Sequence, residues 1–424
     1  MIITPSCVNA THITIGDLAG SDPAWSRDQR LAAAVALRHL PQPTPRDEAW
    51  RYTHLSRLAP PAAYLSPAGD FRGCPATPVM VRTLGEESLP PADAEQGKAG
   101  VTVQDTTEAL NAKIGSQGFF FVNNAHQRDY FSALNCAWRN GGAWFEASAN
   151  TGTEATSLAE HQPQVSAYFP HSVALWNAGS RAAHIEHFRG DSQERQVWGN
   201  IELHIAPNAT GSYALLLDWG ERTDALMQLH LNLHEGSQAE IFIVTLGGRT
   251  NKVMFTSDIV GSNASCRVYG LTYADGKQVF EVNLLQKHHV DHSQSDVLYH
   301  CALDGQARTV FAGNIDVCQA AQKSDAYQKN RNLLLSPLAH AYSQPQLEIV
   351  ADDVRCTHGA NFTSYDPEQQ FYLQSRGIAP AEAQRLIVSG FLQEIVGHFR
   401  PQAGREYLAT QVQRRLGQEE AYDF

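Results

Sequence analysis

Residues 227–240 read MQLHLNLHEGSQAE and combine a strand pattern with a turn. In the first half every second residue is apolar, and this two-residue period places the apolar side chains on one face of a strand. These residues are Met227, Leu229, Leu231 and Leu233. The second half carries the glycine and small polar residues that are typical of a turn. The stretch therefore predicts a strand with one buried face that ends in a turn.

Turn units of this kind recur along the chain. They are IAPNATGS at 205–212, LHEGSQAE at 233–240, IVGSNASC at 259–266, VDHSQSD at 290–296 and VCQAAQKSD at 317–325. Successive units begin 28, 26, 31 and 27 residues apart. A turn that recurs at such a period is typical of a solenoid or a propeller, in which each coil buries its apolar face on the next coil. A β-sandwich with evenly spaced turns is the alternative that this pattern leaves open.

Short strand-like runs extend over the region that begins near residue 118. They lie at 119–122, 213–217, 228–234, 240–246, 266–272 and 279–285. No convincing amphipathic helix interrupts this region, which argues against alternating strands and helices and favours an all-β body. We predict one continuous coil over roughly residues 118–350 and a β domain over 118–365.

A helical pattern precedes this body. Asp22 can cap a helix, Pro23 fits a first helical turn, and residues 30–40 are rich in Ala and Leu. A second short unit follows at 46–58. We predict that residues 1–117 form a helical and irregular region.

The C-terminal residues 366–424 are predicted to form a helical domain. Pro380 and Glu382 mark a helix start, because proline and an acidic residue both suit the first turn of a helix. An apolar stripe follows at a spacing of three and four residues. It includes Leu386, Ile387, Phe391 and Ile395. A second helical segment is predicted at 405–416.

Composition excludes several classes of protein. The 424 residues carry a net charge of −12, whereas a general nucleic-acid binder needs a basic face. No apolar run approaches the roughly 20 residues of a membrane helix. Residues 1–10 lack the basic segment and long apolar core of a signal peptide, so we expect a cytoplasmic protein. The seven cysteines are scattered and form no Cys-x-x-Cys pair, which argues against a disulfide framework and against a structural zinc site.

The standard catalytic motifs are absent from the sequence. It contains no GxxxxGK[ST], GxGxxG, HExxH or GxSxG motif. The pattern gives no positive case for an enzyme, and we expect none. In particular, any ATP hydrolysis would have to take place on another chain.

Two clusters contain residue types that bind metals. The first is KHHVDHSQSD at 287–296, where an extended strand would place His288 and His292 on one face, within reach of one ion. The alternative is that these histidines and the adjacent His289 are solvated on a polar coil.

The second cluster contains Cys356 and His358. They are two residues apart, so on an extended segment their side chains lie on the same side. A thiolate and an imidazole suit iron or an iron–sulfur cluster, but two ligands do not complete a site. The alternative is a partly buried Cys beside a structural His.

Several longer motifs resemble the SufB/SufD family of the SUF iron–sulfur cluster assembly system. They are KNRNLLL at 329–335, QPQLEI at 344–349, ADDVRCTHGA at 351–360 and QFYLQSRGI at 370–378. Upstream, EAWRYT at 48–53 and FSALN at 131–135 resemble earlier family elements. Within the family, the Cys-x-His-Gly-Ala form is similar to the SufD branch rather than the SufB branch. Residues 148–200 match the family pattern poorly.

The resemblance implies a fold and a role. The fold would be a right-handed parallel β-helix between an N-terminal and a C-terminal helical region. The role would be that of a scaffold subunit that pairs with a SufB homologue and binds the SufC ATPase, in a complex that assembles clusters. A homodimer is expected when the chain is produced alone. The remaining alternatives are an exported-type β-helix carbohydrate-active enzyme and a purely structural interaction protein.

The resemblance also assigns expected sites. His358 and Cys356 would lie at the junction with the SufB homologue and handle iron or a nascent cluster, which is transient and shared with that chain. The C-terminal domain would dock the ATPase, through the stripe that contains Leu386, Ile387, Phe391 and Ile395. The resemblance leaves open that the full complex holds a reduced flavin.

Overall fold

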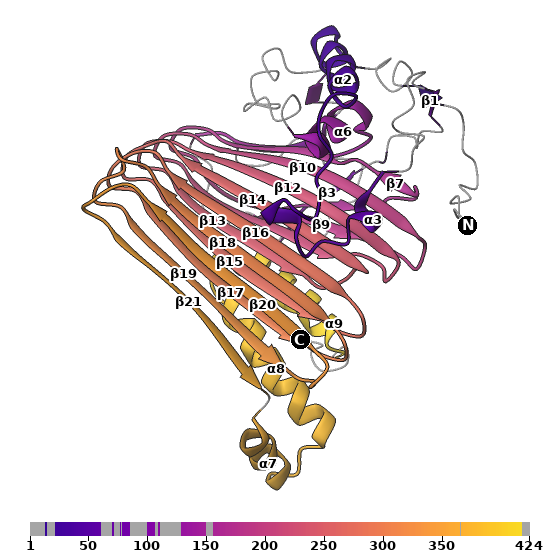
Figure 1. Cartoon of the computed structure of the whole chain (residues 1–424), viewed down its shortest axis with the longest axis vertical. Coiled ribbons are helices and arrows are strands. Elements are labelled where there is room, and N and C mark those ends of the chain that lie inside the picture. Colours follow the sequence, from indigo (N-terminus) through magenta and orange to yellow (C-terminus); the bar gives the residue numbers. More distant parts are fainter. Residues whose placement is uncertain are drawn as a thin grey trace.

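The chain forms a parallel β-helix of about seven turns with helices at both ends (Figure 1). This computed structural model describes residues 13–14, 22–60, 70–71, 77, 79–84, 100–106, 109–110, 129–149, 156–364 and 366–417. Among the described residues, no helix combines the length and the apolar composition needed to cross a membrane. The predicted strand at 119–122 lies outside the described residues.

Two long sheets form the walls of the β-helix. The first contains β4 (Val101–Asp105), β5 (Ala143–Ala147), β7 (Ala167–Tyr168), β8 (His171–Trp176), β10 (Arg195–Ile205), β12 (Thr223–Leu233), β14 (Thr250–Ile259), β16 (Val279–His288), β18 (Arg308–Val317) and β20 (His340–Ile349). The second contains β3 (Val79–Leu84), β6 (Thr156–His161), β9 (Arg181–Arg189), β11 (Thr210–Asp218), β13 (Gln238–Thr245), β15 (Ser265–Ala274), β17 (Gln294–Leu303), β19 (Asp325–Leu334) and β21 (Arg355–Ser364). From β8 onward the chain alternates between the sheets, and each strand pairs in parallel with the strand one coil earlier. This parallel pairing excludes the β-sandwich alternative.

The recurring turn units form one corner of the β-helix. The corners in this series hold a residue with a left-handed backbone, which glycine and asparagine adopt more readily than other residues. The corner residues are Gly179, Asn208, Gly236, Asn263, His292 and Lys323. The residue that follows each of them is small and fully buried: Ser180, Ala209, Ser237, Ala264, Ser293 and Ser324. A small side chain has to stack on its counterpart in the next coil, so the sequence repeat reflects the packing of this corner.

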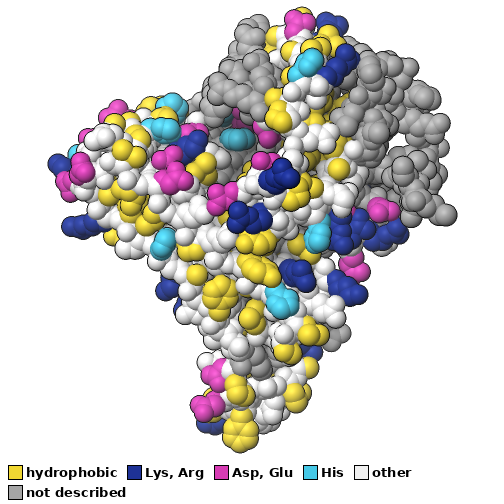
Figure 2. Space-filling model, viewed as in Figure 1, with side chains coloured by type: hydrophobic (Ala, Val, Ile, Leu, Met, Phe, Trp, Pro, Cys, Tyr) yellow, Lys and Arg dark blue, Asp and Glu magenta, His cyan; other side chains and the backbone are white. Residues whose placement is uncertain are grey.

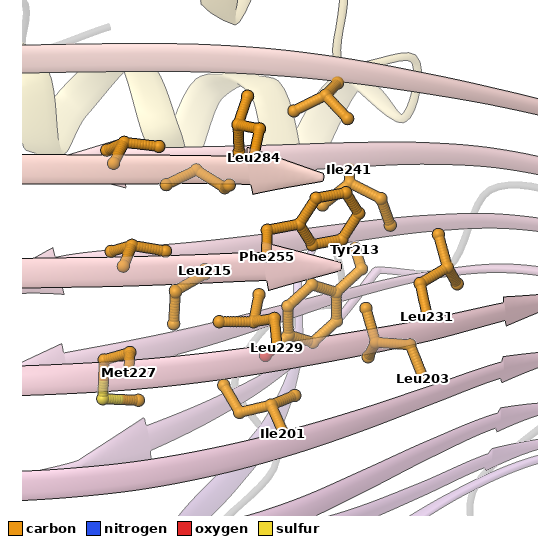
Figure 3. Close-up of a cluster of buried hydrophobic side chains, with 14 of the residues drawn as sticks. Ile201, Leu203, Tyr213, Leu215, Met227, Leu229, Leu231, Ile241, Phe255 and Leu284 are labelled. Carbon is orange, nitrogen blue, oxygen red and sulfur yellow. The ribbon is translucent and has the colours of Figure 1, made fainter. Parts of the chain in front are cut away.

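The main core lies between the two sheets, and strands of both sheets contribute alternate residues to it (Figure 3). The predicted inner face of β12 is confirmed, because its apolar residues are fully buried. These are Met227, Leu229, Leu231 and Leu233. Tyr213 and Leu215 of β11 meet them from the opposite sheet (Figure 3). The hydrophobic effect, at about 25 cal/mol per Å² of buried apolar surface, thus stabilises each coil against its neighbours.

The described N-terminal helices are α2 (Ala24–Ala36), the short 3-10 helix η2 (Glu48–Trp50), α3 (Leu55–Leu58) and α6 (Tyr130–Trp138). Two of them, α2 and α6, pack together at the end where the coil begins, and η2 and α3 lie on the outer face of the first sheet (Figure 1). Helix α6 corrects the expectation that no helix interrupts the chain after residue 118. All nine of its residues are buried, so it has no polar face and leaves no amphipathic pattern.

The sheets also recruit two strands from the region that was predicted to be helical and irregular. The strands are β3 and β4, and each pairs antiparallel with the first strand of its sheet, β6 and β5 respectively. Both strands are only partly buried, so they lack the apolar run of the later coils. A small antiparallel pair also joins β1 (Ile13–Thr14) to β2 (Asp70–Phe71).

The C-terminal chain folds into three helices, and two of them pack on the outer face of the second sheet. These are α7 (Pro367–Ser375), α8 (Pro380–Val396) and α9 (Gln402–Arg415). The predicted helix start at 379–382 is confirmed, and the second predicted helix begins at Gln402 instead of 405. Helix α8 is anchored by His300 of β17, whose Nδ1 lies 2.8 Å from the carbonyl oxygen of Phe391 and whose ring stacks on the Phe391 ring.

Buried histidines make the fold sensitive to acid. Burial lowers the pKa of His184 to about 4 and that of His187 to about 3. In the unfolded chain a histidine has a pKa near 6.5. The contribution of these two histidines to the free energy of unfolding is therefore fully present above about pH 6.5, and it is lost as the pH falls toward their pKa values in the folded protein. We expect His184→Gln to reduce the loss of unfolding free energy between pH 7 and pH 5 by about 2 kcal/mol. His39→Gln is the control, because His39 is exposed. Urea titrations at the two pH values test this, and an unchanged loss in His184→Gln would contradict it.

Candidate functional site

The β-helix ends in two strands that have a free edge. β20 pairs only with β18 and β21 only with β19 within the described chain, so both leave one row of backbone groups unpaired. Large apolar side chains are exposed here: Leu338, Ile349, Val350 and Phe362. A long free edge with exposed apolar residues is a typical surface for pairing with another chain. We call the surface formed by β20, β21 and the turns beside them the open end.

Cys356 lies on β21 at the open end. It is in register with the buried Ala326 of β19, so its side chain continues the inner row of that strand. It packs against a small apolar cluster formed by Ile315, Val317, Ala321, Ala326 and Ala351. Burial, with a contribution from the Asp325 carboxylate, raises the pKa of the Cys356 thiol. Cys356 is therefore a neutral thiol near pH 7.

His358 continues the same inner row two residues further along β21. Its register neighbour is Gln328, which is buried, whereas the His358 side chain is exposed. Within the described part of the chain, no group of three or more His, Cys, Asp or Glu side chains is arranged to hold a metal ion. Cys356 and His358 therefore supply at most part of a site.

The floor of the open end is formed by amide side chains. Gln328, Asn330 and Asn332 of β19 point into the β-helix and are at most 3 % exposed. The Nδ2 atom of Asn332 donates to Oδ1 of Asn330 at 2.7 Å, and Nδ2 of Asn330 donates to the Tyr299 carbonyl at 3.2 Å. This layer was not predicted from the sequence. The alternation of amides in residues 328–332, QKNRN, is the signal that marks it.

The histidine cluster at 288–292 does not form the predicted shared face. β16 ends at His288, whose ring is buried and lies within hydrogen-bond distance of Ser293 and Ser295. His292 lies in the following turn with a φ of 53° and pairs with Asp291, and His289 pairs with Asp258. The interpretation as an extended segment was wrong because the left-handed corner turns the chain between His288 and His292.

The predicted C-terminal stripe is divided between the interior and the surface. Ile395 is fully buried against the β-helix, Phe391 and Ile387 are half-buried, and Leu386 is exposed. Two larger side chains on α7, Phe371 and Tyr372, are more exposed, and α7 buries none of its residues. Figure 2 shows hydrophobic side chains at the tip that α7 forms.

A cavity of about 250 Å³ lies on the outer face of the first sheet, under residues 48–52. The charged side chains in and beside the cavity form ion pairs or hydrogen bonds with other residues of the chain. The Nζ atom of the buried Lys252 lies 3.0 Å from Oε2 of Glu281, and the Thr53 hydroxyl donates to the same oxygen at 2.6 Å. The exposed Glu48 accepts from Gln346 at 2.8 Å. These contacts attach the N-terminal segment to the sheet.

Comparison with known proteins agrees with this architecture. A family model described as "SUF system FeS cluster assembly, SufBD core domain" matches residues 158–391, which is more than half of the chain. The chain belongs to the SufBD family. The match contains the coils from β9 to β21, Cys356, His358 and the amide layer.

Similar proteins carry the same assignment. The iron–sulfur cluster assembly protein SufD of Escherichia coli is 29 % identical over 90 % of this chain and 92 % of its own length. SufD of Bacillus subtilis is 24 % identical over 93 % and 95 %. A SufBD family protein of Mycobacterium tuberculosis is 31 % identical over 59 % and 64 %. The chain is therefore a SufD-like member of the SufBD family, as the resemblance predicted.

Proposed function

We propose that the chain is a scaffold subunit of a SUF complex, and that its open end pairs with a SufB homologue. The observation that carries this proposal is the free edge of β20 and β21, which presents His358 beside unpaired strands in a SufBD core. Iron or a nascent cluster is then held transiently between the two chains as cargo. When the chain is produced alone, we expect a second copy to occupy the open end.

Of the two predicted ligands, His358 carries the larger share of the iron-handling role. It is exposed, and a neutral imidazole offers a lone pair to a metal. Cys356 is half-buried in an apolar cluster, and its raised pKa disfavours the thiolate that binds metals. Cys356 therefore makes a secondary contribution, through packing and as an occasional ligand.

The chain has no catalytic turnover of its own in this proposal. ATP hydrolysis belongs to a SufC-type ATPase, because the sequence lacks the phosphate-binding loop that such hydrolysis needs. No feature of the cavity under residues 48–52 favours a carbohydrate-active enzyme, since the Glu281 carboxylate is engaged by Lys252 and Thr53. The cytoplasmic location and a reduced flavin in the full complex stay predictions.

The C-terminal helices are the proposed docking site for the ATPase. We expect the double substitution Phe371→Glu and Leu386→Glu to weaken ATPase binding at least about 30-fold, because interface hot spots lose 2 kcal/mol or more when apolar anchors are replaced. Both side chains are exposed, so the fold should persist. Deleting residues 367–424 is a poorer test, since it would uncover the buried cluster that α8 and α9 form with the β-helix.

Isothermal titration of the purified ATPase into the chain measures this effect. The control is Leu31→Glu, which introduces the same charge at an exposed leucine of α2, on the N-terminal side of the molecule. If the double variant binds the ATPase as tightly as the Leu31→Glu control, the docking site lies elsewhere.

A further inference from the structure

The Gln328 side chain is buried in a space that fits an amide. It is 3 % exposed, and its Nε2 atom donates to the Gly313 carbonyl oxygen at 3.2 Å. A Cβ atom on Gly313 would lie 2.3 Å from Gln328 Oε1 and 2.5 Å from its Cδ, so only glycine leaves room for the amide. The Gly313 carbonyl oxygen can accept a hydrogen bond from the amide nitrogen of Gln328 but not from its amide oxygen. This contact therefore identifies which end of the Gln328 side chain is Oε1.

The other end of this amide has no partner. Among the described residues, no donor reaches Gln328 Oε1, although the atom is buried. Buried polar atoms are almost always hydrogen-bonded, and an exception calls for an unseen partner. Gln328 is in register with His358, and both belong to the inner row of the second sheet. Neighbouring strands lie about 4.8 Å apart, so the two side chains are adjacent.

We propose that Gln328 is a positioning residue for His358. Its Oε1 accepts the ring N–H of His358 when the open end is covered by the partner chain, and the other ring nitrogen is then directed at iron. A neutral imidazole has one N–H and one lone pair, so fixing the donor also fixes the nitrogen that binds metal. Metal-bound histidines nearly always donate their second nitrogen in this way. The inference rests on the proposed function of His358.

The same layer provides a matched control. Asn332 lies on the same strand and face, is 2 % exposed, and also has an amide oxygen without a partner among the described residues. Its register neighbour is Phe362, whose side chain has no N–H to donate. Asn332 donates to Asn330 Oδ1 and to the Asn361 carbonyl oxygen of β21. Within the described chain, Gln328 donates only to the Gly313 carbonyl. Loss of the Asn332 amide should therefore disturb the core and β21 at least as much as loss of the Gln328 amide, without removing an acceptor for the ring N–H of His358.

The test is an anaerobic Fe²⁺ titration of the chain co-expressed with its SufB-type and SufC-type partners. We expect Gln328→Leu to bind Fe²⁺ 10- to 100-fold more weakly, which is the usual effect of losing a hydrogen bond behind a metal ligand. Gln328→Glu, which keeps an acceptor, and Asn332→Leu should stay within threefold of the parent. Gly313→Ala should weaken Fe²⁺ binding by the same factor as Gln328→Leu, because the new methyl group displaces the flexible Gln328 amide.

Each result separates the possibilities, with thermal unfolding midpoints recorded for every variant. Equal losses in Gln328→Leu and Asn332→Leu, or a loss in Gln328→Glu as large as in Gln328→Leu, would overturn the positioning role. If His358→Ala loses Fe²⁺ while Gln328→Leu and Gly313→Ala keep it, the positioning role fails and the proposed function stands. If His358→Ala also keeps Fe²⁺, the proposed function fails and the inference fails with it.

Discussion

Replacing Phe362 with Asp should separate the chain from its partner at the open end, with a dissociation constant raised at least about 30-fold. Phe362 lies on β21 and is 50 % exposed, beside the free edge that we propose another chain covers. Pairing would take its ring out of water, and a carboxylate at this position would be desolvated without a partner. A loss of 2 kcal/mol or more at such an anchor corresponds to this fold-change.

Sedimentation velocity over a range of concentrations measures the effect, both for the chain alone and with its SufB-type partner. Met80→Asp is the control, since Met80 is an exposed apolar residue on β3, the outermost strand at the other end of the same sheet. We expect the control to pair like the parent. A parent chain that stays monomeric in both experiments, with its open end bare, would contradict the pairing proposal.

The β-helix was predictable because its corners impose a local constraint on the sequence. Asn208, Gly236 and Asn263 adopt left-handed backbones at matching positions, and each is followed by a small residue that stacks on the next coil. The small residue recurs in each of these coils, also after His292 and Lys323, so the period is visible without knowledge of the fold. Helix α6 was missed for the opposite reason, because a helix buried on all sides has no periodic polar face.

The candidate site was predictable in part. The two-residue spacing of Cys356 and His358 indicated a shared face, and their register neighbours Ala326 and Gln328 do share the inner face of β19. Spacing carries no information about burial, so it could not separate the half-buried thiol from the exposed imidazole. The buried amides were missed because polar residues at alternate strand positions usually face water. The burial of Gln328 depends on Gly313, which lies 15 residues earlier on β18 and leaves space for the amide.

The second large effect is expected for His358→Ala. Loss of the imidazole removes the metal ligand that we propose at the open end, while an exposed position should leave the free energy of unfolding within about 0.5 kcal/mol of the parent. Binding of the ATPase should also persist, because the proposed docking residues lie on α7 and α8. Cys356→Ser should reduce cluster content more mildly, since the Cys356 thiol is neutral and half-buried.

The iron and acid-labile sulfide content of the purified, anaerobically prepared complex tests the central claim most directly. The chain is co-expressed with a SufB-type protein and a SufC-type ATPase, the proposed partners, as the parent, as His358→Ala and as Cys356→Ser, and each metal content is divided by the amount of assembled complex. The account predicts that His358→Ala retains less than about a tenth of the parent's iron and that Cys356→Ser retains the larger part. A fully assembled His358→Ala complex that holds as much iron and sulfide as the parent would contradict it.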